Sequence, residues 1–394
     1  MDITIQPGKL HGPVEVIPSK SQAHRLLICA AFADKPTTIC CRATNRDIEA
    51  TADCLRALGA KIDREPFGYC VEPIGEVPRT AQLPCCESGS TLRFLLPVVG
   101  ALGVDATFLM EGRLPQRPLS PLWEELERMG CTLSQPSSNT IRCTGKLRSG
   151  AYSIPGNVSS QYISGLLFAH MLMENCTLAI TGPIESAPYI DMTRQAIAKF
   201  PLKGSPVITV EGDWSNGAFW LAAKELGSEL SIFDLRPDSP QGDRACADLI
   251  PALRERQTIC AADIPDLVPI LSVVAAANRG AVFTNIRRLR LKESDRVASV
   301  IAMIENLGGR AEATDDTLTV FGTGLRGGTV DAVNDHRIAM SAAIAATVCK
   351  EPVTILGAEC VQKSYPTFWK EYERLSQPSP LGKVPQRAAR GRGG

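Results

Sequence analysis

The chain has 394 residues, its 42 Lys and Arg balance its 42 Asp and Glu, and 44% of it is hydrophobic. This length suffices for two or more hydrophobic cores, and zero net charge argues against a general nucleic-acid surface. The first residues lack the basic and apolar regions of a signal peptide, and no stretch of sequence reaches the length of a membrane span. We therefore expect a cytoplasmic protein.

The 14 cysteines and four histidines are scattered along the chain. Their spacing matches no metal site, and the cysteines show no disulfide framework. Most of the cysteines are therefore interpreted as small core residues, and free thiols in this number are typical of a reducing compartment.

After a first strand over residues 1–7, six similar segments follow one another along the chain. Each begins with polar residues, continues through an Ala- and Leu-rich helix and ends in a β-branched strand. The helices are predicted over residues 24–33, 90–99, 160–169, 217–223, 266–276 and 336–346, and the strands over 37–39, 106–109, 177–180, 230–233, 281–283 and 353–356. Because these helices are apolar almost all round, we expect them to be buried.

A second, amphipathic helix that ends at glycine is predicted over residues 47–60, 122–130 and 297–309. The repeat period is roughly 65 to 70 residues. Two units look abbreviated, because no Leu-Gly ending follows Phe200 and only a short segment with Pro251 precedes Asp263. We predict an α/β (α+β) fold of six repeats, two of them abbreviated. The Pro-, Gly- and Arg-rich residues 379–394 are expected to be a disordered tail, with a nucleic-acid-binding arm as the alternative.

Polar residues concentrate where the buried helices begin. These clusters are residues 18–25, 87–93, 156–161, 263–266 and 334–337. Helix amino termini favour anions, although Ser and Asn there could simply cap the helices. Lys20, Arg25, Arg93 and Arg337 are costly beside buried helices unless an anion or carboxylate meets them. The clusters therefore indicate a phosphorylated ligand. No P-loop or dinucleotide motif is present, and the glycines of residues 322–328 are interpreted as a turn.

Residues 287–296 carry five cationic side chains and two carboxylates. Such a segment can hold an anion and place acid/base groups beside it. The alternative is a solvated loop with local ion pairs.

These residues together resemble the 5-enolpyruvylshikimate-3-phosphate synthase (3-phosphoshikimate 1-carboxyvinyltransferase) family of enolpyruvyl transferases, over residues 3–375. The matching motifs are Ser19-Lys-Ser with Arg25, Ser88 to Arg93, Arg113 to Arg117, Ser159-Ser-Gln161, Ser186 to Tyr189, Glu211 to Asp213, Asp266, Lys292 to Arg296, Asn334 to Arg337 and Lys363 to Pro366. The resemblance implies a two-lobed, inside-out α/β barrel of βαβαββ units. One lobe would be discontinuous, comprising residues 1–18 and 211–378, and residues 19–210 would form the inserted lobe.

The resemblance also implies a reaction. The enolpyruvyl group of phosphoenolpyruvate moves to the 5-hydroxyl of shikimate 3-phosphate and phosphate leaves, in a monomer that uses no cofactor and no metal. Shikimate 3-phosphate would be bound by Lys20, Ser21, Arg25, Ser159, Ser160, Gln161, Ser186, Tyr189, Asp266 and Lys292. Phosphoenolpyruvate would be bound by Lys20, Gly89, Arg117, Gln161, Arg296, Arg337 and Lys363.

Within that resemblance, Lys20 lies between the substrates, Asp266 is the candidate general base and Glu293 the candidate proton donor. His336 is a further catalytic candidate, for which plain helix capping is the alternative. Gly89 would leave room for the inhibitor glyphosate, in competition with phosphoenolpyruvate. Arg288 departs from the Asn of some family members.

Three other functions fit parts of this pattern. A UDP-N-acetylglucosamine enolpyruvyl transferase has Lys-Asn where this chain has Lys20-Ser21, and it usually has a loop Cys that residues 113–117 lack. An inactive anion-binding homologue is disfavoured because Lys20, Asp266, Glu293 and Lys363 are all present. An RNA-end-processing enzyme of similar repeat fold is disfavoured by the zero net charge.

Overall fold

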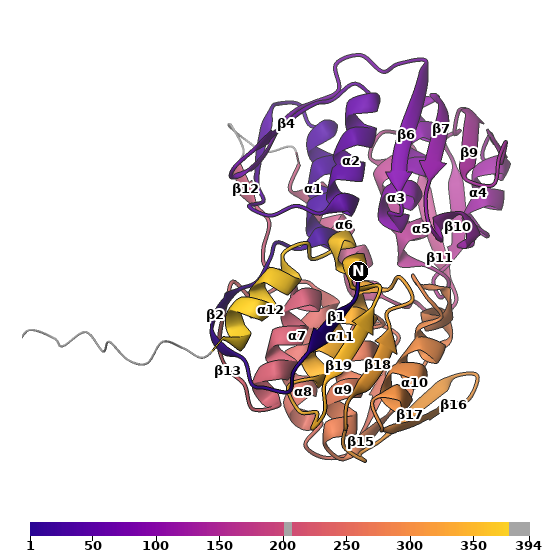
Figure 1. The fold of residues 1–394 in the computed structure, drawn as a ribbon. Coiled ribbons are helices and arrows are strands. Elements are labelled where there is room, and N and C mark those ends of the chain that lie inside the picture. The colour runs from indigo at the N-terminus through magenta and orange to yellow at the C-terminus, as the bar shows by residue number, and fades with distance from the viewer. Residues whose placement is uncertain (201–206, 378–394) are drawn as a thin grey trace, which may run out of the picture.

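The computed structural model describes residues 1–200 and 207–377. It has two lobes, each built from small sheets that surround buried helices (Figure 1). The predicted tail, residues 379–394, lies outside the described residues.

The upper lobe in Figure 1 contains helices α1 to α6 and strands β3 to β12. Its helices are α1 (Lys20–Ala31), α2 (Arg46–Ala57), α3 (Gly89–Leu102), α4 (Leu122–Arg128), α5 (Ser160–His170) and α6 (Ala187–Ala198), with the 3-10 helix η1 (Leu114–Gln116). Its strands are β3 (Thr37–Cys40), β4 (Lys61–Glu65), β5 (Gly68–Glu72), β6 (Thr80–Cys86), β7 (Asp105–Met110), β8 (Cys131–Ser134), β9 (Thr140–Gly145), β10 (Ala151–Pro155), β11 (Thr177–Thr181) and β12 (Val207–Thr209). They form sheets in the orders β12-β3-β5-β4, β6-β7-β9-β8 and β10-β11.

The lower lobe contains the first two strands and everything from α7 onward. Its helices are α7 (Trp214–Glu225), α8 (Cys246–Ala252), α9 (Val268–Ala277), α10 (Arg296–Asn306), α11 (His336–Ala345) and α12 (Phe368–Ser376), with 3-10 helices η2 (Gly242–Ala245), η3 (Arg287–Leu291) and η4 (Ala358–Lys363). Its strands are β1 (Ile3–Ile5), β2 (His11–Glu15), β13 (Glu229–Phe233), β14 (Gln257–Cys260), β15 (Gly280–Thr284), β16 (Arg310–Ala313), β17 (Thr317–Phe321), β18 (Gly328–Asp331) and β19 (Val353–Leu356). The sheet orders are β13-β2, β14-β15-β17-β16 and β1-β19-β18.

The predicted repeat unit is clearly seen in the first half of the chain. In the second unit, for example, α3 connects the parallel strands β6 and β7, and α4 leads to the antiparallel pair β8 and β9. The outer helices α2, α4 and α10 end where predicted, because Gly59, Gly130 and Gly308 have φ of 106°, 116° and 82°, a conformation that costs little only for glycine.

The third and fourth units are abbreviated, as predicted, with two-stranded sheets. The third unit still has its second helix, α6. Among the residues that the structure describes, no antiparallel pair follows α6, and β12 pairs in parallel with β3 of the first unit. The sixth unit, predicted to be complete, has three strands, since β1 from the start of the chain takes an edge beside β19.

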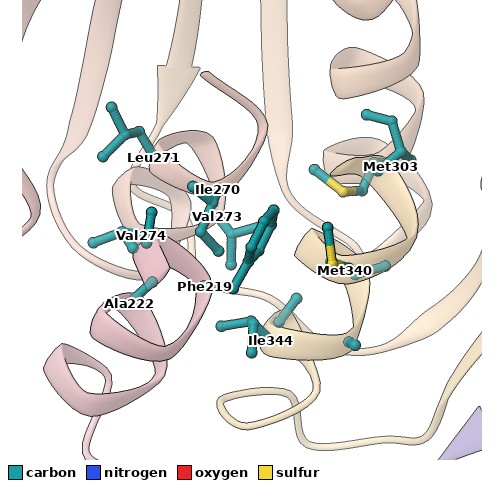
Figure 2. Packing of buried hydrophobic residues seen from close by; sticks show 14 of the residues in the cluster. Phe219, Ala222, Ile270, Leu271, Val273, Val274, Met303, Met340 and Ile344 are labelled. Carbon is teal, nitrogen blue, oxygen red and sulfur yellow. The ribbon is translucent and has the colours of Figure 1, made fainter. Parts of the chain in front are cut away.

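Two clusters of buried apolar side chains fill the lobes. One lies between Ala23 and Val210 in the sequence, and the other joins the first strands to residues 214–375. Figure 2 shows part of the second, where Phe219 of α7 lies among side chains of α9 and α11. The chain crosses between the clusters at neighbouring positions, since Ser19 N donates to Glu211 O at 2.8 Å. The clusters support the lobe boundaries 18/19 and 210/211, which stay a prediction.

All 14 cysteines have free thiols, and nine of them are buried, as expected of small core residues. Within residues 1–200 and 207–377, none of the helices combines the length and the apolar character that crossing a bilayer requires.

Candidate active site

A polar cavity lies where the buried helices of both lobes begin. Fourteen of the predicted site residues line it: Lys20, Ser21, Arg25, Gly89, Arg117, Ser159, Ser160, Gln161, Ser186, Tyr189, Asp266, Lys292, Glu293 and Arg337. Arg296, His336 and Lys363 do not line the cavity, although Arg296 is bonded to Asp266 and Glu293 of its wall and Lys363 is paired with Glu87 of its wall. Residues from distant parts of the sequence thus meet at one place, as a shared site requires.

Helix capping accounts for some residues of the polar clusters, and the other residues of the clusters do not cap a helix. Ser159 Oγ accepts from Gln161 N at 3.3 Å, and Asp335 Oδ1 accepts from Arg337 N at 3.0 Å. In each case the cap is one residue, and Ser160 and Gln161 after the first cap and Arg337 after the second line the cavity. Asp266 is not a cap, because α9 begins two residues after it. Capping alone therefore does not account for the clusters.

Cations outnumber acids in the cavity wall. The wall carries seven cationic side chains, Lys20, Arg25, Arg93, Arg117, Arg288, Lys292 and Arg337, and five acidic ones, Asp47, Glu87, Asp213, Asp266 and Glu293. In a chain with no formal net charge, this local excess favours an anionic ligand.

Arg296 orients the two candidate acid/base carboxylates from behind. Its side chain is 1% exposed, and its Nη1 and Nη2 donate to Asp266 Oδ1 and Glu293 Oε2, each at 2.5 Å. Its Nε donates to Asp335 Oδ2 at 2.8 Å. A guanidinium that satisfies three carboxylates holds them in one rigid arrangement.

The surroundings set the pKa values of these carboxylates. Burial raises the pKa of Asp266, but Arg337, Lys292 and Arg296 outweigh burial and hold it well below its usual range. Burial also raises the pKa of Glu293, and again the neighbouring arginines outweigh it. Both carboxyl groups are therefore ionised in the unliganded protein.

Three cavity arginines, Arg93, Arg117 and Arg337, each have a buried nitrogen without a partner among the described residues. Arg337 donates from Nη2 to Asp266 Oδ2 at 3.1 Å, while its Nε and Nη1 have no partner among the described residues. Arg117 Nη1 lies 3.9 Å from Glu293 Oε1, and its Nε has no partner in the described chain. Buried donors without acceptors are costly, and an anion between these arginines would remove that cost.

Lys20 lines the cavity and contacts residues of both lobes. Its Nζ lies 2.9 Å from Asp47 Oδ2, and its backbone N donates to Asp213 Oδ2 at 3.1 Å. Burial lowers the pKa of Lys20, but Asp47 and Glu293 outweigh burial and the pKa is raised. Lys20 therefore stays a cation where the helix starts converge.

A second group of side chains surrounds Ser186. Ser186 adopts a positive φ of 57° before α6, and its Oγ accepts a hydrogen bond from Arg288 Nη1 at 3.1 Å. Arg25 donates from Nε to Thr193 Oγ1 at 2.8 Å, and Tyr189 OH donates to Asp243 Oδ2 at 3.1 Å. Burial lowers the pKa of Lys292 to about 8.

His336 and Lys363 lie outside the cavity lining. His336 is 2% exposed, and neither of its ring nitrogens has a partner within residues 1–200 and 207–377. Burial lowers its pKa to about 3, so the ring is neutral. The capping alternative for His336 is wrong, because Asp335 is the N-cap of α11. Lys363 pairs with Glu87 and donates to Asn334 O at 3.0 Å.

The segment 287–296 is partly a solvated loop with ion pairs and partly a piece of the cavity wall, so both interpretations given for it hold in part. Arg290 forms an exposed local pair with Asp295 at 3.3 Å, and Arg287 forms an exposed pair with the more distant Asp316 at 3.6 Å. Arg288, by contrast, turns into the cavity wall together with Lys292 and Glu293. The sequence pattern alone does not separate these two faces of η3.

The site residues predicted from the sequence do not include several lining residues. These lining residues are Asp47, Glu87, Arg93, Asp213, Ser215, Asn216 and Arg288. Asp213 caps α7 by accepting from Asn216 N at 2.9 Å. The polar start of that apolar helix is the same signal as in the other clusters, and it could have identified this part of the wall.

The fold and the cavity define an α/β enzyme whose cationic cavity wall suits small, strongly anionic molecules beside acid/base groups. A model of the family EPSP synthase (3-phosphoshikimate 1-carboxyvinyltransferase) matches residues 5–372. Proteins named 3-phosphoshikimate 1-carboxyvinyltransferase from Clostridium kluyveri and Clostridium perfringens are 35% and 36% identical to this chain, over 95% of it and over 97% and 98% of their own lengths. The chain therefore belongs to the EPSP synthase family, which confirms the resemblance.

A solved structure agrees with the fold. An EPSP synthase from Acinetobacter baumannii superposes with a TM-score of 0.77 at 22% identity, covering 95% of this chain and 98% of that one. At that identity the likeness shows the shared two-lobed architecture.

Proposed function

We propose that this protein transfers the enolpyruvyl group of phosphoenolpyruvate to the 5-hydroxyl of shikimate 3-phosphate and releases phosphate. The single observation that carries the proposal is the cavity between the lobes, where seven cations surround the carboxylates of Asp266 and Glu293. Two multiply charged anions repel each other, and a preorganised set of cations offsets that repulsion while it aligns the reacting atoms.

Shikimate 3-phosphate would occupy the side of the cavity near Ser186. Its phosphate would meet Ser159, Ser160, Ser186 and Lys292, and Arg25 with Ser21 would hold its carboxylate. Gln161 and Tyr189 would contact the ring. Serine hydroxyls and a lysine ammonium offer the donors that a phosphate dianion requires.

Phosphoenolpyruvate would lie nearer α11 and the loop of Arg117. Arg117 and Arg337 have the unpaired buried donors described above, and their planar forks match a carboxylate or phosphate. Lys20 would lie between the two substrates, and Gly89 would leave room for the second. Arg296 would add positive charge from behind Asp266 and Glu293, and Lys363 would contact the ligand at the edge of the cavity beside Glu87.

Asp266 would accept the proton of the 5-hydroxyl as its oxygen attacks C2 of phosphoenolpyruvate. In the unliganded protein Lys292 Nζ lies 3.5 Å from Asp266 Oδ1 and suppresses its basicity. A bound phosphate would draw Lys292 away, and this would raise the pKa of Asp266 at the moment when a base is needed.

Glu293 would give a proton to the methylene carbon, and the addition yields a tetrahedral intermediate. The Glu293 carboxylate then takes a proton back from the new methyl group, and the C2–O bond to phosphate breaks, which completes the transfer. An anion that binds Arg117 beside Glu293 would raise the pKa of this carboxyl group and so favour its protonated form. His336, neutral and buried behind Lys20 and Glu293, would support this end of the site.

The same site would also bind an inhibitor, and it bears on the oligomeric state of the protein. Glyphosate would compete with phosphoenolpyruvate, because it is a small anion that needs the same arginines. Residues from both lobes of one chain line the cavity, so a monomer would suffice, and we expect the enzyme to act in the cytoplasm.

A phosphate-release assay tests the proposal. With phosphoenolpyruvate present, shikimate 3-phosphate should support turnover and UDP-N-acetylglucosamine should not. The proposed function would be contradicted if only UDP-N-acetylglucosamine supported turnover, or if neither of the two acceptors did.

A further inference from the structure

Glu87 reaches from one lobe to a lysine of the other. It follows β6 and precedes the cap of α3 in the upper lobe, and its Oε2 forms an ion pair with Lys363 of η4 in the lower lobe. The same oxygen accepts from Asn334 Nδ2 at 3.4 Å. The carboxyl group packs against Gly112, where a Cβ would come within 2.5 Å of Glu87 Cδ. The contacts with Lys363, Asn334 and Gly112 therefore hold the carboxylate in this position.

The pair involves a cation that the proposed reaction needs. The Lys363 side chain is 12% exposed and Glu87 is 28% exposed, so water screens this ion pair less than a surface pair. Lys363 also donates to Asn334 O at 3.0 Å, which leaves one ammonium donor for a ligand. Arg117 and Arg337, by contrast, retain unpaired nitrogens in the part of the chain that the structure describes.

We propose that Glu87 lowers the affinity for phosphoenolpyruvate, because its carboxylate pairs with Lys363 across the cleft and competes with the ligand for that ammonium group. This inference rests on the proposed function. A phosphoenolpyruvate that engages Lys363 must displace the carboxylate of Glu87 and then lie close to it. Both effects oppose binding, because an ion pair is lost and two like charges approach each other. Shikimate 3-phosphate binds away from this pair and is not affected.

The direct test is Glu87→Gln, which keeps the shape of the side chain and removes its charge. The KM for phosphoenolpyruvate should fall about three- to tenfold, while the KM for shikimate 3-phosphate stays within about twofold. Glu111→Gln is the matched control, since Glu111 is an exposed carboxylate of the same lobe outside the cavity lining; it should change neither value. An unchanged or higher KM for phosphoenolpyruvate in Glu87→Gln overturns the inference.

A second measurement does not depend on turnover. A double-mutant cycle of Glu87→Gln and Lys363→Met in the free energy of unfolding should show favourable coupling between the two side chains. Zero coupling means that the pair is absent in solution, and this also overturns the inference. Glu87→Asn replaces Glu87→Gln in both experiments if circular dichroism shows that the glutamine variant is unfolded.

Failure of the proposed function gives a different pattern. A wild-type protein without turnover on shikimate 3-phosphate contradicts that function whatever Glu87 does. In that case the affinities of wild-type protein and Glu87→Gln for phosphoenolpyruvate are compared by titration calorimetry with shikimate 3-phosphate present. Tighter binding by the variant supports the inference, and equal or weaker binding contradicts it.

Discussion

The guanidinium of Arg296 lies 2.5 Å from Asp266 Oδ1 although 30 residues separate them. The same side chain is 1% exposed and also pairs with Glu293 and Asp335. Breaking a buried ion pair by removing one partner leaves uncompensated charge. Arg296 is thus both a structural centre of the lower lobe and the support for two candidate catalytic groups.

Replacing Arg296 by Met should lower the free energy of unfolding by about 3–5 kcal/mol, because three carboxylates lose their cation. Urea denaturation at neutral pH measures this loss. Arg290→Met is the control, since Arg290 is 38% exposed and pairs only with Asp295 at 3.3 Å among the described acids; it should cost no more than about 1 kcal/mol.

The same loss should depend on pH. Asp266 and Asp335 have folded-state pKa values below their usual range. Their contribution to stability is therefore present above the unfolded value of about 4 and is lost as pH falls through the folded values. The difference between wild type and Arg296→Met should shrink in acid, and a difference that grows there would contradict the ion-pair explanation.

Lys20→Ala and Glu293→Ala should each lower kcat by more than about 100-fold, because one removes the cation between the substrates and the other the proton donor. Steady-state phosphate release measures both. Lys61→Ala, at a 79% exposed lysine paired with Glu72, should leave kcat unchanged. A near-normal rate in either site variant would remove that residue from the mechanism.

Gly89→Ala should weaken binding of phosphoenolpyruvate and glyphosate. A Cβ at this position would lie 2.5 Å from Arg93 Nη1 and 2.8 Å from Arg117 Nη1, so both arginines must shift. Overpacking of this kind should raise the KM for phosphoenolpyruvate and the inhibition constant of glyphosate by roughly tenfold or more. Gly75→Ala, where a Cβ meets nothing within 4 Å, is the control. Unchanged inhibition in Gly89→Ala would count against the proposed position of the inhibitor.

Binding of shikimate 3-phosphate should weaken in alkali. Burial lowers the pKa of Lys292 to about 8, so its ammonium is present at neutral pH and is lost as pH rises through that value. Because the phosphate is already a dianion above neutral pH, the dissociation constant should rise by up to about tenfold per pH unit beyond 8. Titration calorimetry from pH 7 to 10 measures this, and Lys292→Arg should flatten the profile. A flat profile in the wild-type protein would exclude Lys292 as the titrating contact.

Local sequence patterns predicted the six buried helices with the strands that follow them, the repeat, and the polar groups at the helix starts. Six apolar helices, each followed by a β-branched strand, are local patterns, and the structure has all six of these pairs. The glycines after the outer helices are equally local, because a helix terminus needs a residue that tolerates positive φ. The motifs carried the family resemblance for the same reason, since each lies within a few consecutive residues.

Which of these groups face each other depends on the packing of the folded chain. Neighbouring arginines such as Arg287 and Arg288 look alike in sequence, yet one is 76% exposed and the other 13%. The pairs Glu87–Lys363 and Arg296–Asp266, like the addition of β1 to the last sheet, join residues far apart in the chain. Such pairs depend on how whole lobes pack, and the free energy that selects them comes from burial and desolvation, which no local stretch of sequence contains.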